Sequence, residues 1–409
     1  MMSRTPKWAV RCGTAGVTVA LIAAGLAGIA GSQGVALAAR GTLGPAERPV
    51  GGRPVADRPA ALANPYSPAT NHPYRHGVLP TIGRERQIRA WARRAAAVAK
   101  LTARGASSPL NLSYGGGVHG VGVTTGHEKV YLVFWGSQWG KQSAGAHGDI
   151  RLTGDPSGEA PYLQQLFKGL GTGGETWSGV MTQYCDGVKY NALSCPSNAR
   201  HVAYPTGGAL AGVWVDERTT APANATGNQL GAEAIAAAHH FGNMSNSANR
   251  NAQYDILSPT GTHPDGFNTP NGQFCAWHDD TADPTLPSGP VSSTLDIAFT
   301  NMPYVTDLGI SCGQDFVNSG KAGLLDGVSI VNGHEYAETI TDQLPAFGWT
   351  NYLTGEETGD LCAWNQTGIS GGTNDLVLPT GTFAMQSTWS NDRYGVGGCE
   401  FSHWVVTNK

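Results

Sequence analysis

One short stretch of this chain places residue types that bind metal ions at the spacing of a helix. His334, Glu335 and Glu338 follow one another in the order H-E-x-x-E within residues 328–342. On a helix His334 and Glu338 lie one turn apart, roughly 6 Å along the axis, and share a face. Glu335 is rotated by about 100° from His334, from where it could reach a water molecule on a bound ion. The pattern therefore predicts a metal site with two ligands on one helix.

The residues around this motif favour the helix that it needs. Asp326 is of a type that caps helix starts, and Leu344-Pro345 is expected to end the helix. An apolar flank is expected from three further residues, Ile330, Ala337 and Ile340. The arrangement corresponds to the H-E-x-x-H zinc helix with its second histidine replaced by Glu338. The alternative is an acidic, solvated helix face with a capped histidine.

The motif and the residues after it resemble the thermolysin-like, or gluzincin, metallopeptidases. In that family a downstream glutamate is the third ligand, and an aspartate shortly after it fixes the first histidine. Glu357 and Asp360 match those positions in Gly355-Glu-Glu-Thr-Gly-Asp360. The resemblance implies a ligand set of His334, Glu338 and Glu357. It also implies that Glu335 is the general base, and that Asp360 holds the second ring nitrogen of His334. The implied activity is that of an exported zinc endopeptidase acting on a protein or peptide.

The sequence departs from this family in one ligand. Glu338 in place of a histidine gives one imidazole and two carboxylates, which acidify a bound water less than a histidine-rich set does. A harder ligand set is also compatible with Mn²⁺, Fe²⁺ or Ca²⁺. Zn²⁺ is the expected ion, with another divalent metal as the alternative.

Two other groups of residues could contribute to such a site. A metallopeptidase needs a donor near the developing oxyanion, and His403 or Tyr394 could supply it; otherwise His403 is a structural residue beside the last cysteine. His278-Asp279-Asp280 could offer oxygen ligands to calcium, but a solvated loop is the favoured interpretation because the calcium-loop spacing is incomplete. No G-x-S-x-G elbow, phosphate-binding loop or dinucleotide fingerprint is present in the needed form.

Residues 1–39 have the pattern of a secretory signal peptide. Three basic residues precede an apolar segment, and Ala36-Leu-Ala38 forms an A-x-A cleavage site. No later segment approaches about 18 consecutive apolar residues, so no membrane span is expected. The mature protein is expected to be secreted and monomeric.

The next segment, residues 40–110, is basic and rich in Pro, Ala and Arg. It holds twelve basic and three acidic residues, a net charge of +9, whereas residues 111–409 hold eleven basic and 27 acidic residues, a net charge of −16. The part up to about Pro80 is expected to be disordered, and residues 84–104 to form a helix. We interpret this arm as a propeptide, a wall-binding arm or a flexible linker. The acidic remainder argues against nucleic acid as a partner.

Six cysteines follow the signal segment, an even number that indicates disulfides in an exported chain. Fifteen connectivities are possible, and pairing between neighbours is the simplest. The expected pairs are Cys185–Cys195, Cys275–Cys312 and Cys362–Cys399.

Strand and helix patterns alternate through residues 111–409. Residues 129–135 form a near-continuous apolar run that predicts a buried strand, and further strands are expected at 212–215, 255–257 and 295–299. Residues 228–241 are rich in alanine and predict a helix. The fold class is therefore predicted as α/β or α+β, with a mixed sheet and an active-site helix in one large disulfide-bonded domain.

A second set of short motifs resembles the plant EXORDIUM, or phosphate-induced, family. The shared features are Phe134-Trp135-Gly136, Gly261-Thr-His263, Cys275-Ala-Trp277 and Thr339-Ile-Thr-Asp342, and they cover much of residues 111–365. This resemblance implies a shared fold without the H-E-x-x-E motif. The alternative function is accordingly a non-catalytic extracellular or cell-wall protein that binds glycans through its tryptophans.

Overall fold

The computed structural model of the protein describes residues 64–407, apart from 69–74, 100–109 and 353. The chain divides into two compact units, Met1–Leu43 and Gly44–Lys409. The first unit, which contains the predicted signal peptide, lies outside the described residues, as does the arm up to residue 63. Among the helices that the structure describes, none is both long and apolar enough to cross a membrane.

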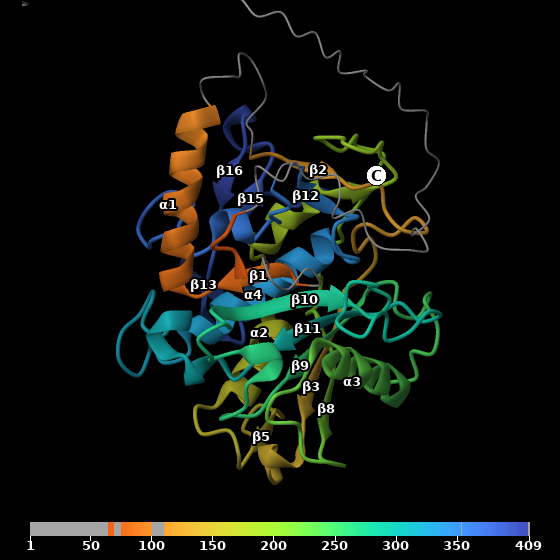
Figure 1. Cartoon of the computed structure of the whole chain (residues 1–409), viewed down its shortest axis with the longest axis vertical. Coiled ribbons are helices and arrows are strands. Elements are labelled where there is room, and N and C mark those ends of the chain that lie inside the picture. The colour runs from red at the N-terminus through yellow and green to blue at the C-terminus, as the bar shows by residue number, and fades with distance from the viewer. Residues whose placement is uncertain (1–63, 69–74, 100–109, 353, 408–409) are drawn as a thin grey trace, which may run out of the picture. The chain divides into compact units, whose positions relative to one another are not determined.

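A six-stranded mixed sheet forms the centre of the second unit (Figure 1). Its order is β1-β10-β11-β9-β3-β8. The last four strands in this order are parallel, and β10 and β1 extend the sheet in antiparallel pairing. The bounds are β1 His76–Pro80, β3 Lys129–Trp135, β8 Leu210–Asp216, β9 Ala252–Leu257, β10 Phe274–Asp280 and β11 Ala298–Met302.

The parallel strands lie where the apolar runs of the sequence predicted them. Strand β3 has the predicted bounds 129–135, and residues 130–135 are all buried, as expected for a strand covered on both faces. The strands predicted at 212–215 and 255–257 are parts of β8 and β9. The strand predicted at 295–299 begins instead at Ala298.

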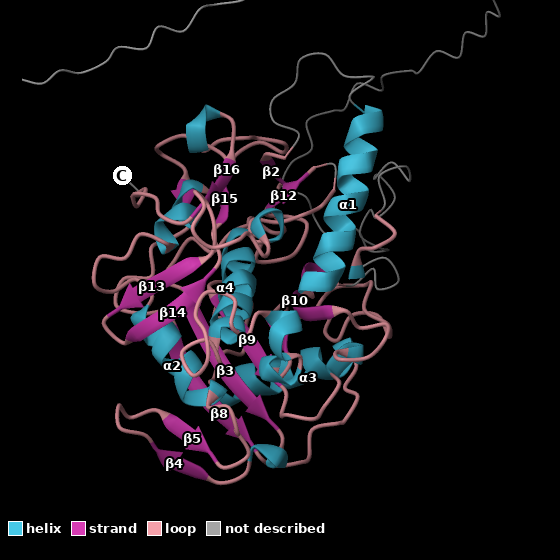
Figure 2. Ribbon diagram, turned by 90° about the vertical axis from the view of Figure 1, so that its left-hand side faces the viewer, coloured by secondary structure: helices cyan, strands magenta, loops and turns pink. Residues whose placement is uncertain are grey.

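Helices cover both faces of this sheet (Figure 2). Helix α2, Glu159–Gly169, connects β3 to β8, and α3, Gly227–His240, connects β8 to β9 on the other side of β3. Because the direction along the sheet reverses, right-handed crossovers place these helices on opposite faces. Helix α4, Asp326–Thr341, packs against α2, β1, β10 and β14. The prediction of a mixed α/β arrangement is confirmed.

Five two-stranded sheets complete the part of the chain that the structure describes, and two of them support the site described below. Strand β14 lies against α4, while β15 and β16 lie beside the chain around residue 360. The pairs are β2 Leu112–Tyr114 with β12 Trp349–Asn351, β4 Gln142–Ala144 with β5 Ile150–Leu152, β6 Cys185–Asp186 with β7 Arg200–His201, β13 Asn374–Leu378 with β14 Gly381–Met385, and β15 Thr388–Ser390 with β16 Gly398–Glu400. All three expected disulfides are present: Cys185–Cys195, Cys275–Cys312 and Cys362–Cys399.

The N-terminal arm differs from the expectation of disorder up to Pro80. Residues 76–80 form β1, an edge strand of the central sheet, because β10 supplies the hydrogen-bonding partners that the Pro/Arg-rich sequence does not reveal. Helix α1, Ile82–Ala99, follows it and corresponds to the helix predicted over 84–104. His278-Asp279-Asp280 also differs from its favoured interpretation as a solvated loop, since these residues end the fully buried strand β10.

Candidate metal centre

Helix α4 is buried along its whole length, from Asp326 to Thr341. It is therefore a central helix and has no solvated acidic face. Asp326 does not cap it, since its carboxylate instead accepts hydrogen bonds from the backbone N–H groups of Val317 and Asn318 at 2.8 and 2.6 Å. The polar side chains of the H-E-x-x-E motif must consequently find partners inside the protein.

His334 and Glu338 face each other across one helical turn, as predicted. Their atoms Nε2 and Oε2 are 3.1 Å apart, and neither side chain is exposed. Each of these two atoms is buried without a hydrogen bond among the described residues. The other oxygen of Glu338, Oε1, accepts hydrogen bonds from the N–H groups of Gly359 and Asp360 at 3.1 and 2.9 Å. The backbone thus fixes this carboxylate with Oε2 directed at the imidazole.

A second imidazole, that of His278, reaches the same carboxylate from β10. Its Nε2 atom lies 3.7 Å from Oε2 of Glu338 and 3.2 Å from Oε2 of Glu357. Side chains alternate along a strand, so the same register that places Trp277 on one face of β10 places His278 on the face toward α4. The sequence offered no helical spacing that linked His278 to the motif, and the sheet brings them together.

The loop after β12 supplies the remaining carboxylates. Glu357, the predicted third ligand, forms with His278 and Glu338 a group whose ligand atoms all lie within 4.8 Å of one another. Asp360 forms a second such group with His334 and Glu338. Glu338 is common to both groups. The structure therefore brings Glu357 to the site, as expected, but its direct neighbour is His278.

Within each of the two groups, ligand atoms are spaced as a divalent ion requires. Metal bonds of about 2.0–2.2 Å in a tetrahedron place ligand atoms roughly 3.3–3.5 Å apart. The pairs at 3.1, 3.2 and 3.7 Å bracket that range. A pair of ligand atoms that approach without a hydrogen bond, Nε2 of His334 and Oε2 of Glu338, is also what a shared ion would require. The residues present therefore fit a metal ion, although these distances do not select zinc.

The buried carboxyl groups of the cluster also favour a bound cation. Burial raises the pKa of Glu335 well above its ordinary value, and the negative charge of Glu338 raises it further. Burial and then the charge of Asp342 raise the pKa of Glu357, and burial and the charge of Glu338 raise that of Asp360. So many carboxyl groups in one buried place are costly unless protons or a cation neutralise them.

Gln386, which the sequence did not single out, orients His334. Its Oε1 lies 3.3 Å from Nδ1 of His334, and its amide nitrogen donates to the carbonyl oxygens of Gly359 and Ser387. The predicted holder of this ring, Asp360, lies instead near the opposite nitrogen, at 3.8 Å from Nε2. The reason is that Asp360 is turned toward the backbone N–H of Glu357, from which its Oδ2 accepts a hydrogen bond at 3.0 Å.

Glu335 follows His334 directly on α4. Its side chain is fully buried, and neither carboxyl oxygen has a hydrogen-bond partner among the described residues. A buried carboxyl group that makes no hydrogen bond costs free energy and needs an explanation. A water molecule or substrate atom at the metal would supply the missing partner.

His403, the predicted oxyanion donor, belongs to a different cluster. Its Nε2 is 3.2 Å from Asp392, and its Nδ1 is 2.6 Å from the carbonyl oxygen of Trp404. With Asp392 and Glu400 it forms a separate set of metal-ligand types near the C-terminus. Tyr394 is exposed. None of the contacts described for His403 joins it to His334, Glu338 or Glu357, so its predicted role gains no support from its position.

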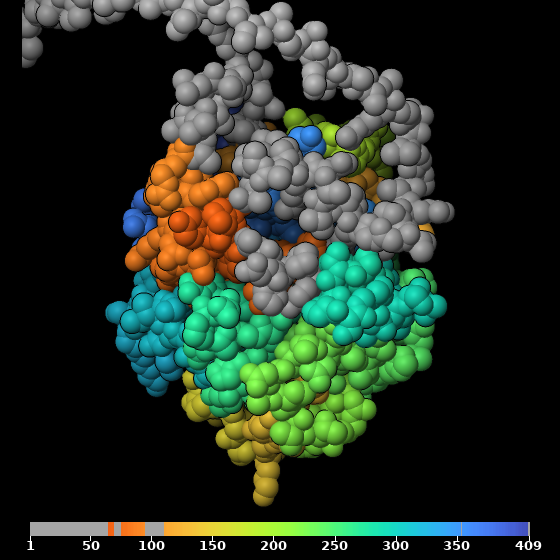
Figure 3. Space-filling model, viewed as in Figure 1, coloured from red at the N-terminus to blue at the C-terminus, as the bar shows by residue number. Residues whose placement is uncertain are grey.

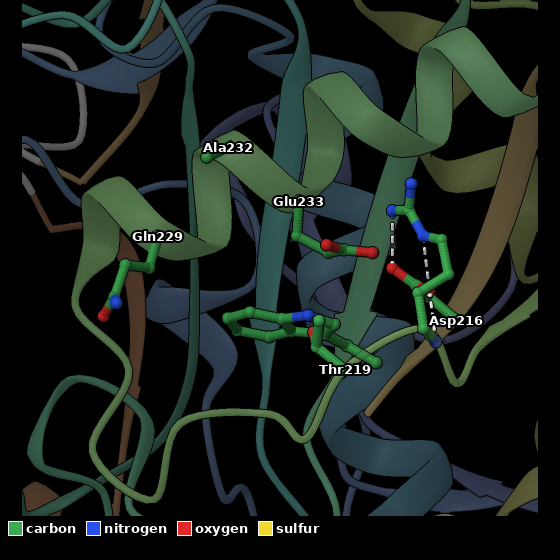
Figure 4. A pocket seen from close by; sticks show the side chains of 7 residues that line it. Asp216, Thr219, Gln229, Ala232 and Glu233 are labelled. Atoms are coloured by element: carbon green, nitrogen blue, oxygen red, sulfur yellow. Dashed lines mark hydrogen bonds and ion pairs between the residues drawn. The ribbon is translucent and has the colours of Figure 1, made fainter. Parts of the chain in front are cut away.

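A surface pocket of about 500 Å³ lies away from these ligands, at the carboxyl ends of β3 and β8 (Figure 4). Arg218 pairs there with Asp216, and Glu233 points toward the same carboxylate. Burial, the hydrogen bond to Asp216 and its charge raise the pKa of Glu233 to about 8. The pocket is lined by Trp135, Asp216, Arg218, Thr219, Gln229, Ala232 and Glu233, none of which belongs to the metal-ligand groups.

No protein-family model, curated protein or solved structure matches this chain. The resemblances to thermolysin-like peptidases and to EXORDIUM proteins therefore rest on their short motifs alone. What the chain can do has to be argued from the geometry of the site.

Proposed function

We propose that this protein is an exported, zinc-dependent endopeptidase whose metal ion is bound where the two ligand groups meet, at Glu338. The observation that carries this proposal is the buried cluster in which His334, Glu338 and His278 direct atoms toward one another at 3.1 and 3.7 Å. Glu357 and Asp360 complete the cluster from the two sides. The presence of a second imidazole makes zinc a better candidate than the predicted single-histidine set did, since imidazole nitrogens suit zinc.

Each residue of the site has a role in this proposal. His278, His334, Glu338 and Glu357 would hold the ion, and Gln386 keeps the ring of His334 in place. A bound zinc ion would supply a water molecule of lowered pKa and polarise the scissile carbonyl. Glu335 would act as the general base, taking a proton on a carboxylate oxygen and returning it to the nitrogen of the leaving amine.

The substrate class and the location rest on separate support. A peptide substrate is favoured by the H-E-x-x-E motif, in which a glutamate follows the first ligand directly. Export is favoured by the signal-peptide pattern of residues 1–39, and the three disulfides are compatible with it.

Metal analysis and one isosteric substitution test the proposal. To include the case in which residues 40–110 are a propeptide, the full chain carries an added recognition site for a specific protease within residues 100–109. Metal content and casein hydrolysis are measured before and after cleavage at that site. We expect about one zinc ion per cleaved chain, as in other single-ion catalytic sites. Glu335→Gln is expected to retain the metal and lower hydrolysis by roughly 10²–10⁴-fold, because the general base is lost.

The matched control is Glu128→Gln, which changes another buried glutamate outside the ligand groups. It should leave metal content and hydrolysis unchanged. His278→Ala should lower zinc affinity as His334→Ala does, whereas His403→Ala should not. Absence of bound zinc in both forms of the chain, or wild-type hydrolysis by Glu335→Gln, would contradict the proposal.

A further inference from the structure

Strand β1 lies directly on the metal-ligand atoms. A Cβ atom at Gly77 would overlap Oε2 of Glu338 and the imidazole of His278, so only glycine fits there. The backbone of Gly77 also has a φ of +48°, which disfavours other residue types. The backbone of Gly77 thus fills the space directly beside Glu338 and His278.

The pairing of β1 with β10 holds Gly77 in this place. His76 is paired with His278, and Leu79 with Ala276, in an antiparallel register that is irregular on both sides of Leu79. Leu79 is fully buried, while β1 itself forms the outer edge of the sheet. An extended segment that adds to a sheet edge through its backbone is a common way for a peptide to bind.

Side chains from the metal-site loop and from β10 secure the same segment. Trp364, four residues after Asp360, donates its indole N–H to the carbonyl oxygen of Pro80 at 2.7 Å. Arg75 pairs with Asp265 at 2.8 Å, and its guanidinium lies over the ring of Phe274. These contacts join the N-terminal segment to the loop after Asp360, to Asp265 and to β10.

Helix α1 also contacts the loop that follows Glu357 and Asp360. Arg89 donates to Asn365 at 3.1 Å and to the carbonyl oxygen of Ala363. Figures 1 and 3 show α1 at the surface of the molecule, in orange, with much of its length projecting beside the remaining structure. The basic charge of residues 40–110 and the acidic charge of residues 111–409 favour this association.

No disulfide joins this segment to the rest of the described chain. The three disulfides connect cysteines between residues 185 and 399 only. Once the chain is cut after α1, the segment is held by noncovalent contacts alone. Its position at a sheet edge means that its removal leaves the pairing among β11, β9, β3 and β8 intact.

We propose that residues 75–99, which form β1 and α1, are an inhibitory segment that occupies the substrate position of the metal centre until the chain is cut behind α1. This inference rests on the proposed function for its meaning, because an inhibitory segment needs an activity to inhibit. The occlusion itself is independent of bound metal. The surface that the segment vacates is the edge of β10, and the ligand class that fits this edge is an extended peptide.

Histidine modification measures the occlusion without any need for metal or activity. The metal-free full chain with the cleavable site in residues 100–109 is treated with diethyl pyrocarbonate before cleavage, and again after cleavage and gel filtration in high salt. Mass spectrometry then follows His278 and His334, with exposed His239 as the internal control. We expect modification of His278 and His334 to rise at least tenfold after the segment is removed, with no change at His239.

The possible results separate this inference from the proposed function. Equal modification of His278 and His334 before and after cleavage overturns the inference, as does a segment that cannot be removed without unfolding the remainder. If the histidines become accessible but the zinc-loaded product hydrolyses no peptide, the occlusion stands and the peptidase proposal fails. Accessibility together with a rise of at least tenfold in casein hydrolysis supports both.

A substitution in the uncut chain gives a second test. Gly77→Ala should push β1 away from the ligands and increase modification of His278 several-fold. Gly83→Ala is the matched control, because a Cβ at Gly83 in α1 meets no atom within 4 Å. Thermal melting checks that both variants fold. Wild-type protection of His278 in a folded Gly77→Ala protein would count against the proposed position of β1.

Discussion

At the scale of single residues, the tautomer of His334 follows from its contact with Gln386. The amide nitrogen of Gln386 donates to two backbone carbonyl oxygens, which leaves its Oε1 as the acceptor facing Nδ1 of His334. Nδ1 is therefore placed to donate its hydrogen to Gln386, and Nε2 faces Glu338. A neutral imidazole with this tautomer is the form that binds a metal ion.

Removal of this acceptor should weaken metal binding without removing a ligand. We expect Gln386→Leu to lower zinc affinity by about 10–100-fold, the usual cost of losing a partner that orients a ligating histidine. Competition with a fluorescent zinc chelator measures the affinity. The control is Gln164→Leu, an equally buried glutamine whose hydrogen bonds are all with residues 150–160. It should lower the melting temperature and leave zinc affinity unchanged, and equal affinities in both variants would rule out the orienting role.

The ligands on one helix could be predicted from the sequence, but the ligand from the sheet could not. His334 and Glu338 are related by a helical turn, so their spacing alone indicated a shared face. His278 reaches Glu338 only because β10 runs beside α4, a tertiary relation that the Trp-His-Asp-Asp sequence does not carry. Asp360 was placed correctly near His334, but its orientation depends on a backbone N–H that no pattern specifies.

At the scale of elements, the loop that carries Glu357 and Asp360 is held against a separate platform. The backbone N–H of Trp389 in β15 donates to the carbonyl oxygen of Thr358 at 2.7 Å. Cys362, two residues after Asp360, is joined to Cys399 in β16. The loop therefore depends on β15 and β16 for its position, whereas His334 and Glu338 depend on α4.

The disulfide at this loop should accordingly matter for metal binding as well as for stability. We expect Cys362→Ser with Cys399→Ser to lower zinc affinity by about tenfold or more, because the carboxylates lose their fixed orientation. The control pair, Cys185→Ser with Cys195→Ser, removes a disulfide that contributes no neighbour to the ligands. Both double variants should lose stability, by about 2–5 kcal/mol each. Unchanged zinc affinity in the first pair would show that the loop is held by its other contacts.

Elements with a strong pattern of their own could be predicted from the sequence, whereas elements that depend on distant partners could not. Strand β3 and helix α3 are dense in apolar or helix-forming residues, and their patterns were sufficient. Strand β1 has a composition that indicates disorder, and it forms only because β10 offers an unpaired edge. The burial of α4 on every side was likewise hidden, since the helix has polar residues around its circumference and its covering comes from elements distant in sequence.

At the scale of the whole molecule, buried carboxyl groups shape the response to pH. The globular part carries a net charge of −16, and several of its acidic side chains are buried outside the ligand groups. Burial raises the pKa of Glu159 in α2 to about 8, despite hydrogen bonds from the backbone N–H and the hydroxyl group of Thr306. The folded protein consequently binds more protons than the unfolded chain between the ordinary glutamate pKa of about 4.5 and pH 8.

This difference in proton binding predicts that stability falls as the pH rises. A raised folded-state pKa gives a stabilising contribution that is complete below about pH 4.5 and is lost by about pH 8. Glu159→Gln keeps the acceptor oxygen for Thr306 and removes the charge. We expect this variant to melt about 2–5 °C above the wild type at pH 8 and to show no advantage at pH 4.5, in keeping with the size of the chain.

The comparison is made by differential scanning calorimetry in the presence of a chelator, so that metal binding does not add its own pH dependence. The ligand carboxyl groups still titrate, but they do so equally in both proteins, and the difference between the two curves isolates Glu159. Glu217→Gln is the matched control, because Glu217 is exposed and its charge is solvated at every pH. If the melting temperatures of wild type and Glu159→Gln change in parallel across this pH range, Glu159 has no raised pKa in the folded protein and the prediction is wrong.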